Sequence, residues 1–503
     1  MAITTRWTGR YAPAVAIALL GLAPNIVLTT AFTQLSPVLV RDLHTSTLAV
    51  QLAEGLSNAG YAVGAVIAAQ LGQRFVQRRL FLGYEALFVI GSVLAATAPS
   101  FGLFFTGRLL QGAATGLMLV AALPPLVTRF GIKPLPLTVA IVNVGLFGAT
   151  TLGPVVGGPL AAAGDWRPLF WVAAGLGLLG LVVALVGYPE FDPADPSLPV
   201  DRSAISLAAG ATFLPFFATS VLTARTPTSP VFLVPFVLGL AALAVLVVSQ
   251  YRKDQPLMPV KALSTQLPVT GTVVAMVGGA VFITAVELAQ LFLTDVAHAD
   301  PRHTGLLFWT MPVGLVVAAA LFALLLRTRY LAVLVDAGLV ALLGGVALLL
   351  LLDPADPDAV VRWSGLLLGF GAGASVSPGL FLAAFGVVSS KLGRAFALVE
   401  LLRSVAGFAV GPVVVFIARS GSDLETGVQT GLIVLLGLAV LGLLLALAIP
   451  AVSGARLRVP DLQGWLDRDE QALPSPTTAT HLRPGVQDET AEPLLPERVR
   501  RPR

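Results

Sequence analysis

The feature that most constrains this chain is a series of about fourteen long apolar stretches separated by short polar connectors. A helix needs roughly 20 apolar residues to cross a bilayer. Only helices and closed barrels can do so, because every backbone polar group has to be satisfied internally. The sequence therefore predicts an all-α integral membrane protein with about fourteen transmembrane helices. The stretches are Tyr11–Leu35, Leu48–Leu71, Leu80–Thr97, Leu103–Val127, Leu137–Ala162, Leu169–Val186, Ala204–Val221, Val231–Val248, Val269–Leu293, Gly305–Leu326, Leu331–Leu352, Trp363–Val387, Ala395–Ile417 and Val428–Ile449.

Composition excludes several classes of function. Of the 503 residues, 56% are hydrophobic and 12% are charged, which is too little charge to cover a soluble protein of this size. The net charge is +4, but the arginines lie singly between apolar runs and form no stripe for nucleic acid. The absence of cysteine excludes disulfides and thiol chemistry. We expect no metal and no cofactor, because the four histidines have no metal-ligand spacing.

The loop charges predict the orientation. Before the tail, fifteen lysines and arginines fall on the side that holds the N-terminus and six on the other side. Cytoplasmic loops carry the excess of positive charge, so we expect both termini in the cytoplasm. The excess of arginine over lysine is typical of a GC-rich bacterium. We therefore expect a protein of a bacterial cytoplasmic membrane, in contact with lipid. We also expect it to be a monomer.

Two short motifs recur at one offset. Gly107-Arg108-Leu109-Leu110 resembles Gly365-Leu366-Leu367-Leu368, and Gly153-Pro154-Val155-Val156 matches Gly411-Pro412-Val413-Val414, both 258 positions later. Duplicated halves are common in transporters. The repeat predicts four parts: a six-helix bundle (1–188), loops with two inserted helices (189–262), a second six-helix bundle (263–449) and a disordered cytoplasmic tail (450–503). A short helix near Trp465 is expected within the tail.

The fifth stretch is rich in glycine and proline. It contains Gly145, Gly153, Pro154, Gly157 and Gly158, and Asp165-Trp166-Arg167 follows it. Glycines three to five positions apart make a flat helix face that a neighbouring helix can approach closely. This segment resembles the antiporter motif of the fourteen-span drug:proton antiporter branch of the major facilitator superfamily, and the resemblance extends from about Ala12 to Ile449.

Other motifs agree with this family in part. Arg108, Gln111 and Gly112 resemble its Arg-x-x-Gln-Gly motif. The loop after the second stretch occupies the place of the family's gating loop. It keeps Gly72, Arg74, Arg78 and Arg79, but Gln73 and Val76 replace the usual acid and second glycine. In the first stretch, Ala23-Pro24-Asn25 stands where the branch has an aspartate, so the usual first-helix proton site is missing.

Proton coupling needs a carboxylate whose protonation changes as access alternates. Glu54 lies about 10 Å from the outer end of its stretch, at 1.5 Å per residue, and Arg108 and Glu287 lie at comparable depth. We expect these three side chains to form the coupling cluster. Asn25, Gln111 and Gln290 are candidates for the substrate cavity. Two other acids are interpreted as structural: Glu400 as the partner of Arg403, and Glu85 as a neighbour of Arg78 and Arg79.

The resemblance implies export of a hydrophobic or amphipathic drug-like small molecule in exchange for protons, not an enzyme activity. Two alternatives within transport stay open, a specific metabolite or antibiotic exporter and a uniporter without proton coupling. A membrane-embedded enzyme or sensor would have to use the interfacial residues His298, Asp300 and His303, the only candidate cluster of that kind in the sequence. No phosphate-binding loop is present in the sequence.

Overall fold

The predicted helices are observed. The computed structural model describes residues 8–190, 193, 196–197, 199–453 and 459–475. Within that part the chain is helical and contains no strand, and thirteen helices or helix pairs are long and apolar enough to cross a membrane. The fourteenth, α2 (Thr47–Arg74), carries Glu54, Ser57 and Asn58, so its hydropathy is lower. It packs against α4, α8 and α16. The all-α prediction with about fourteen spans is confirmed.

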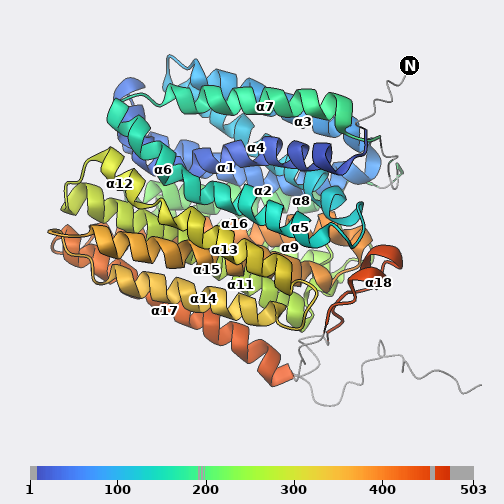
Figure 1. Cartoon of the computed structure of the whole chain (residues 1–503). Coiled ribbons are helices and arrows are strands. Elements are labelled where there is room, and N and C mark those ends of the chain that lie inside the picture. The colour runs from blue at the N-terminus through green and yellow to red at the C-terminus, as the bar shows by residue number, and fades with distance from the viewer. Residues whose placement is uncertain (1–7, 191–192, 194–195, 198, 454–458, 476–503) are drawn as a thin grey trace, which may run out of the picture.

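Figure 1 shows the long helices lying side by side, with the blue and cyan N-terminal helices in one half and the yellow and orange helices in the other. Eleven spans are single helices. In the first half and the insert they are α1 (Tyr11–Asp42), α2, α3 (Gln77–Ala96), α4 (Phe101–Thr128), α7 (Arg167–Gly187), α8 (Arg202–Val221) and α9 (Pro230–Arg252). The others are α14 (Leu331–Leu349), α15 (Asp358–Phe385), α16 (Leu392–Arg419) and α17 (Leu424–Ser453). We call the end at which α1 begins the inner end and the opposite end the outer end.

Three spans are interrupted. The fifth consists of α5 (Leu135–Val142), the π-helical turn η1 (Asn143–Phe147) and α6 (Gly148–Ala163). After the short α10 (Val260–Leu263), the ninth joins α11 (Gln266–Leu291) to a second π-helical turn, η2 (Phe292–Val296). The tenth is split into α12 (Pro301–Leu307) and α13 (Thr310–Leu325). π-Turns inside helices often occur at functional sites.

The glycines of the fifth span hold α6 close to α1. A Cβ added at Gly153 would lie 1.9 Å from Thr30 Oγ1, and one at Gly145 would lie 2.2 Å from Leu19 Cδ2. A Cβ at Gly157 would lie 3.0 Å from the Ala31 carbonyl oxygen. In lipid, helices associate through such close packing, because hydrophobic burial contributes little between them. The flat face inferred from the sequence is therefore a packing face for α1.

Gly158 points to another neighbour. A Cβ there would lie 2.4 Å from the Pro301 carbonyl oxygen, and one at Gly305 would lie 2.5 Å from the Pro154 carbonyl oxygen. The α6 and α12 backbones are therefore in contact at the outer end of the molecule. This contact joins the helices that precede the two inserted helices to those that follow them.

The two inserted helices are tied to α2 at the inner end. Asp201 caps α8 by accepting a hydrogen bond from Ala204 N, and Lys253 Nζ lies 2.6 Å from its carboxylate. The Asp201 amide donates to Gln70 Oε1 on α2. Burial raises the pKa of Asp201, but hydrogen bonds from Lys253, Ser203 and Gln250 outweigh it and lower that pKa to about 2. Because the pKa of Asp201 is depressed in the folded state, the ionised carboxylate stabilises the fold at every pH above the ordinary pKa of an aspartate. This stabilisation is lost only as the pH falls towards 2.

The prediction of a disordered tail is wrong for residues 459–475. These residues contain α18 (Leu462–Asp467), which confirms the short helix near Trp465, and they fold against the inner ends of α15 and α16. Trp465 is fully buried, its Nε1 donates to the Val387 carbonyl oxygen at 2.8 Å, and its ring meets Phe385 edge-on. Asp469 accepts hydrogen bonds from Ser389 and Ser390. The rest of the predicted tail, apart from the end of α17, lies outside the described residues.

Trp465→Ala is expected to release this segment from the helices. Replacing a buried tryptophan by alanine removes about 3–5 kcal/mol of packing free energy. The tail should then be cleaved by protease much faster, while the rest of the chain stays resistant. Limited proteolysis in detergent measures the rate, and Val459→Ala, at an exposed position of the same segment, is the matched control. Equal cleavage of both variants would contradict the docking of Trp465.

Candidate functional site

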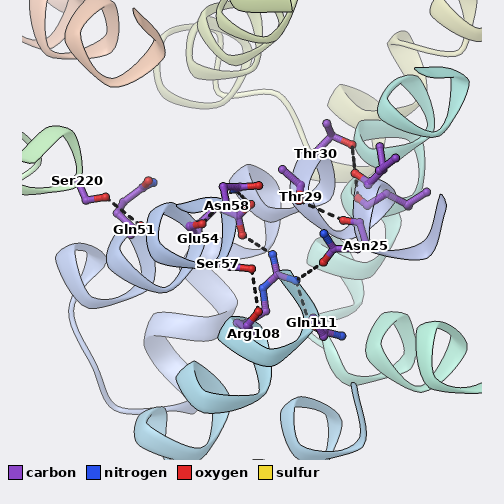
Figure 2. Close-up of polar contacts among 12 residues, drawn as sticks. Asn25, Thr29, Thr30, Gln51, Glu54, Ser57, Asn58, Arg108, Gln111 and Ser220 are labelled. Atoms are coloured by element: carbon purple, nitrogen blue, oxygen red, sulfur yellow. Dashed lines mark hydrogen bonds and ion pairs between the residues drawn. The ribbon is translucent and has the colours of Figure 1, made fainter. Parts of the chain in front are cut away.

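A buried arginine lies among polar groups from three helices. Arg108 on α4 is fully buried, and its Nη2 lies 2.6 Å from Glu54 Oε2 on α2. Its Nη1 donates to Gln111 Oε1 at 3.0 Å and to Asn25 Oδ1 on α1 at 3.4 Å (Figure 2). The structure thus brings together four residues that the sequence placed at the site.

Further groups surround this ion pair. Asn58 Nδ2 donates to the second carboxylate oxygen of Glu54 at 2.8 Å. The Arg108 guanidinium carbon lies 5.4 Å from the centre of the Phe32 ring, within the range of a cation–π contact. A buried charge costs several kcal/mol unless it is paired and hydrogen-bonded. The surrounding acceptors supply that pairing for Arg108.

A cavity lies next to the ion pair. It has a volume of about 90 Å³ and is lined by α1, α2, α6, α8, α11 and α16. Glu54 lines it from α2, while Glu287 and Gln290 line it from α11. Glu287 is partly buried, and no hydrogen bond or ion pair of its carboxylate occurs within the described residues. Glu54 and Glu287 therefore line one cavity. Glu54 does so from α2, which precedes the inserted helices in the sequence, and Glu287 from α11, which follows them.

The cluster differs from the prediction in two respects. Glu287 faces the same cavity as Glu54 but makes no contact with Arg108 in the described part of the chain. Asn25 and Gln111, expected to line the substrate cavity, do not line it and instead accept hydrogen bonds from Arg108. Asn25 lies one helical turn inward of Thr29, which lines the cavity, and Gln111 is on α4, which contributes no residue to the cavity wall.

A second, larger cavity opens at the inner end. Its volume is about 530 Å³, and its walls come from α2, α3, α4 and the start of α16. Gly72 of the predicted gating loop lines it. Arg78 donates to the Leu185 carbonyl oxygen on α7 at 2.7 Å, Arg74 lies at the end of α2, and Arg79 is exposed. Drug-sized ligands occupy pockets of about 300–1,000 Å³, so of these two cavities the inner one has the necessary size in this conformation.

Between the two cavities, α2 and α16 share a polar contact. Tyr61 on α2 donates to Glu400 Oε1 on α16 at 2.6 Å, and Arg403 pairs with the same carboxylate. The pairing of Glu400 with Arg403 agrees with the structural interpretation of the sequence. The Tyr61 contact was missed, because no local pattern relates residues 339 positions apart.

Glu85 is not paired with Arg78 or Arg79. Both carboxylate oxygens are buried without a hydrogen-bond partner. They lie where a Cβ of Gly21 or Gly180 would approach them to 2.8 Å. The sequence placed Glu85 near Arg78 and Arg79 as a structural residue, but α3 directs its side chain between α1 and α7 rather than towards that loop.

Asp300 and His303, which a membrane-embedded enzyme or sensor would have to use, make contacts that stabilise the structure. Asp300 caps α12 by accepting hydrogen bonds from the amides of Arg302 and His303, and His303 Nε2 lies 2.8 Å from Asp358. Within the described residues, no group of three or more histidine or acidic side chains is placed to hold a metal ion.

Comparison with known proteins identifies the family. The model of the Major Facilitator Superfamily matches residues 17–412. The uncharacterized MFS-type transporter YubD of Bacillus subtilis is 25% identical over 82% of this chain and 81% of its own length. The multidrug resistance protein B homolog of Mycobacterium tuberculosis is 27% identical, over 66% of this chain and 62% of its own. The crystal structure of a human organic anion transporter has the same fold, with a TM-score of 0.62 and 17% identity over 87% of this chain and 100% of that one.

The pairing of Glu54 with Arg108 leads to a stability prediction. Arg108→Ala leaves a buried carboxylate without its partner, so it should lower the free energy of unfolding by about 3–5 kcal/mol. Arg108→Gln combined with Glu54→Gln should cost less, because no charge stays unpaired. Thermal unfolding in detergent measures both. Arg362→Ala, which removes a half-exposed pair with Asp358, is the control and should cost less than about 1 kcal/mol. A loss at Arg108 no larger than at Arg362 would contradict the prediction.

Substitution of Glu85 is expected to stabilise the protein, in contrast to substitution of Arg108. Because both of its oxygens are buried without a partner, its polar atoms cost free energy. Glu85→Met, an adaptable apolar side chain of similar length, should raise the free energy of unfolding by about 1 kcal/mol. The same thermal assay tests this, with Glu85→Gln as the polar comparison. A clear loss of stability with methionine would point to a partner for the carboxylate.

Proposed function

The chain belongs to the Major Facilitator Superfamily, and we propose that it exports hydrophobic or amphipathic drug-like molecules in exchange for protons by alternating access. It is thus a multi-pass membrane transporter and not an enzyme. The direction of transport and the substrate class are supported by similarity to a mycobacterial multidrug resistance protein B homolog. The partners in this proposal are a small-molecule substrate, protons and membrane lipid.

One observation carries the proposal: the carboxylates of Glu54 and Glu287 face one cavity in different electrostatic surroundings. Glu54 is paired with Arg108, whereas the Glu287 carboxylate makes no hydrogen bond or ion pair within the described residues. A carboxylate that takes up a proton loses its charge and with it the attraction of a paired arginine. Protonation of Glu54 would therefore weaken its hold on Arg108. Glu287 can pair with a cationic group of a substrate or with a proton.

Alternating access requires two halves that move relative to each other. We assign these halves to residues 1–188 and 263–449, with 189–262 as the insert. Two features support this division. The backbone contact between Gly158 and Gly305 closes the outer end, and the cavity of about 530 Å³ lies at the inner end. The outer-half cavity of about 90 Å³ is too small for a drug, so substrate must enter it in another conformation.

The motif residues take roles in this cycle. Gly145, Gly153 and Gly157 keep the fifth span against α1, so the first half moves as one body, while Pro154 and Gly158 form the outer closure with α12. Gly72 lines the inner cavity, and Arg78 on α3 donates to the Leu185 carbonyl oxygen on α7. Together with Arg74 and Arg79 they can control opening at the inner end. The protein acts as a monomer in a bacterial cytoplasmic membrane, with its inner end and both termini in the cytoplasm.

Proteoliposomes with an imposed pH gradient test the proton coupling. Wild-type protein should move a fluorescent amphipathic cation against its gradient only when the pH gradient is present. Glu54→Gln and Glu287→Gln should each abolish this uphill transport, because neither amide can carry a proton. Glu287→Gln should also weaken binding of the cation, since the unpaired carboxylate is lost.

The control is Glu190→Gln, at an exposed loop position away from the cavity, which should keep wild-type uphill transport. If Glu54→Gln and Glu287→Gln both keep coupled flux, the assignment of these two acids is wrong. If wild-type flux follows the substrate gradient and ignores the pH gradient, the protein is a uniporter.

A further inference from the structure

The first inserted helix, α8, reaches the cavity that holds Glu54 and Glu287. Phe216, Thr219 and Ser220 are on its outer half and form part of the cavity wall. The insert therefore contributes to the interior of the molecule. Nothing in the repeat of the two halves required this, because the insert has no counterpart in either half.

On one side α8 packs tightly against α2. A Cβ added at Gly55 would lie 2.5 Å from Ser220 Oγ, so a larger residue at position 55 would require the Ser220 side chain to move. Ser220 Oγ donates to the Phe216 carbonyl oxygen at 2.8 Å and lies 3.3 Å from the Gln51 carbonyl oxygen (Figure 2). Gln51 and Gly55 also line the cavity; Gln51 lies about one turn before Glu54 and Gly55 directly follows it.

On its other side α8 packs against α16. The Phe216 and Phe408 ring centres are 5.0 Å apart, and both rings line the cavity. Val405 on α16 and Ala59 on α2 complete a small apolar cluster around Phe216. The helix thus lies across the junction of α2 and α16, which belong to different halves of the chain.

The second inserted helix, α9, has a different environment. It packs on the far side of α8, where a Cβ at Gly239 would lie 2.3 Å from Pro215 Cδ. Its other faces are apolar and exposed: Val234, Val237 and Leu238 each show more than half of their surface. In a membrane these side chains meet lipid. Of the two inserted helices, α8 faces the cavity and α9 faces the lipid.

We propose that α8 is a wall of the substrate site, in which Phe216 and Thr219 help to determine which molecules are exported. Phe216, together with Phe32, Phe282 and Phe408, gives the cavity an aromatic surface suited to a flat apolar ring system. Thr219 donates its hydroxyl proton to the Pro215 carbonyl oxygen and adds a hydroxyl oxygen as an acceptor, and Glu287 attracts a positive charge. The preferred substrates are therefore aromatic amphipathic cations. This specificity rests on the proposed export function, but the place of α8 in the cavity does not.

The chain contains no cysteine, so single cysteines can be introduced without removing any native thiol. In proteoliposomes, Thr219→Cys and Ser220→Cys should react with a membrane-impermeant, water-soluble thiol reagent, because the thiolate that reacts forms only where water reaches it. The matched controls are Thr212→Cys, which lies two turns away on the same helix and does not line the cavity, and the lipid-facing Val234→Cys. Labelling at 219 and 220 should be about tenfold faster than at either control.

An aromatic cation such as ethidium should slow labelling at positions 219 and 220 and leave the controls unchanged. Labelling at 219 and 220 no faster than at 212 would overturn the place of α8 in the cavity. Because labelling needs no transport, this result is independent of whether the protein proves to be an exporter. If labelling succeeds but wild-type protein transports none of the tested compounds, the proposed export function fails.

Transport kinetics test the specificity. Phe216→Ala should raise KM for ethidium about tenfold and leave KM for a small non-aromatic cation within about twofold, because the lost contact is with the ring. Val234→Ala, on the lipid face of α9, should change neither value. Equal effects of Phe216→Ala on both substrates would show that Phe216 only supports the packing of α2 and α16, and would overturn its role in specificity.

Discussion

Arg108 carries a positive charge into the interior of a protein surrounded by lipid. Such a residue costs about 2.5–3.5 kcal/mol on insertion scales when it stands in a helix centre, so its helix has to direct it towards other protein groups. The acceptors come from α1, α2 and α4: Asn25, Glu54 and Gln111. These contacts fix the rotation of the three helices about one another. They also hold the Glu54 carboxylate at the edge of the cavity, so the position of the proposed proton site depends on them.

The other constraint comes from helix packing in lipid. Where hydrophobic burial contributes little, helices are held by close backbone contact, and glycine permits that contact. On α6, glycines on one face meet α1 and Gly158 on another meets α12. The first contact is within the N-terminal half, whereas the second joins the two halves at the outer end. Opening the outer end would separate Gly158 from Gly305 while the α1 contact stays intact. One glycine-rich helix can thus serve as both a fixed support and a removable closure.

The two inserted helices differ in hydropathy, and this difference already distinguishes their surroundings. Both α8 and α9 are long and apolar enough to cross a membrane, and neither has a counterpart in the repeat that relates the two six-helix bundles. The mean hydropathy of the two spans differs, however: it is 1.6 for α8 and 3.0 for α9. Thr212, Thr219 and Ser220 explain the lower value of α8, and a helix with such polar positions is expected to face protein. The signal separates a lipid-facing helix from an interior one, but it does not indicate which helices the interior one contacts.

The sequence by itself determined the number and approximate ends of the spans, the need of Arg108 for acceptors, the Glu400–Arg403 pair and the short helix at Trp465. These features depend on local hydropathy, on charge in an apolar run or on spacing within one helix. Only the tertiary structure decided that Asn25 and Gln111 accept hydrogen bonds from Arg108 and do not line the cavity, and that the Glu85 carboxylate has no hydrogen-bond partner in the described part of the chain. It also decided that Tyr61 contacts Glu400 and that residues 459–475 fold onto α15 and α16. Each of these depends on how helices distant in the sequence are placed and rotated, and in a chain of apolar helices many such arrangements satisfy the same local pattern.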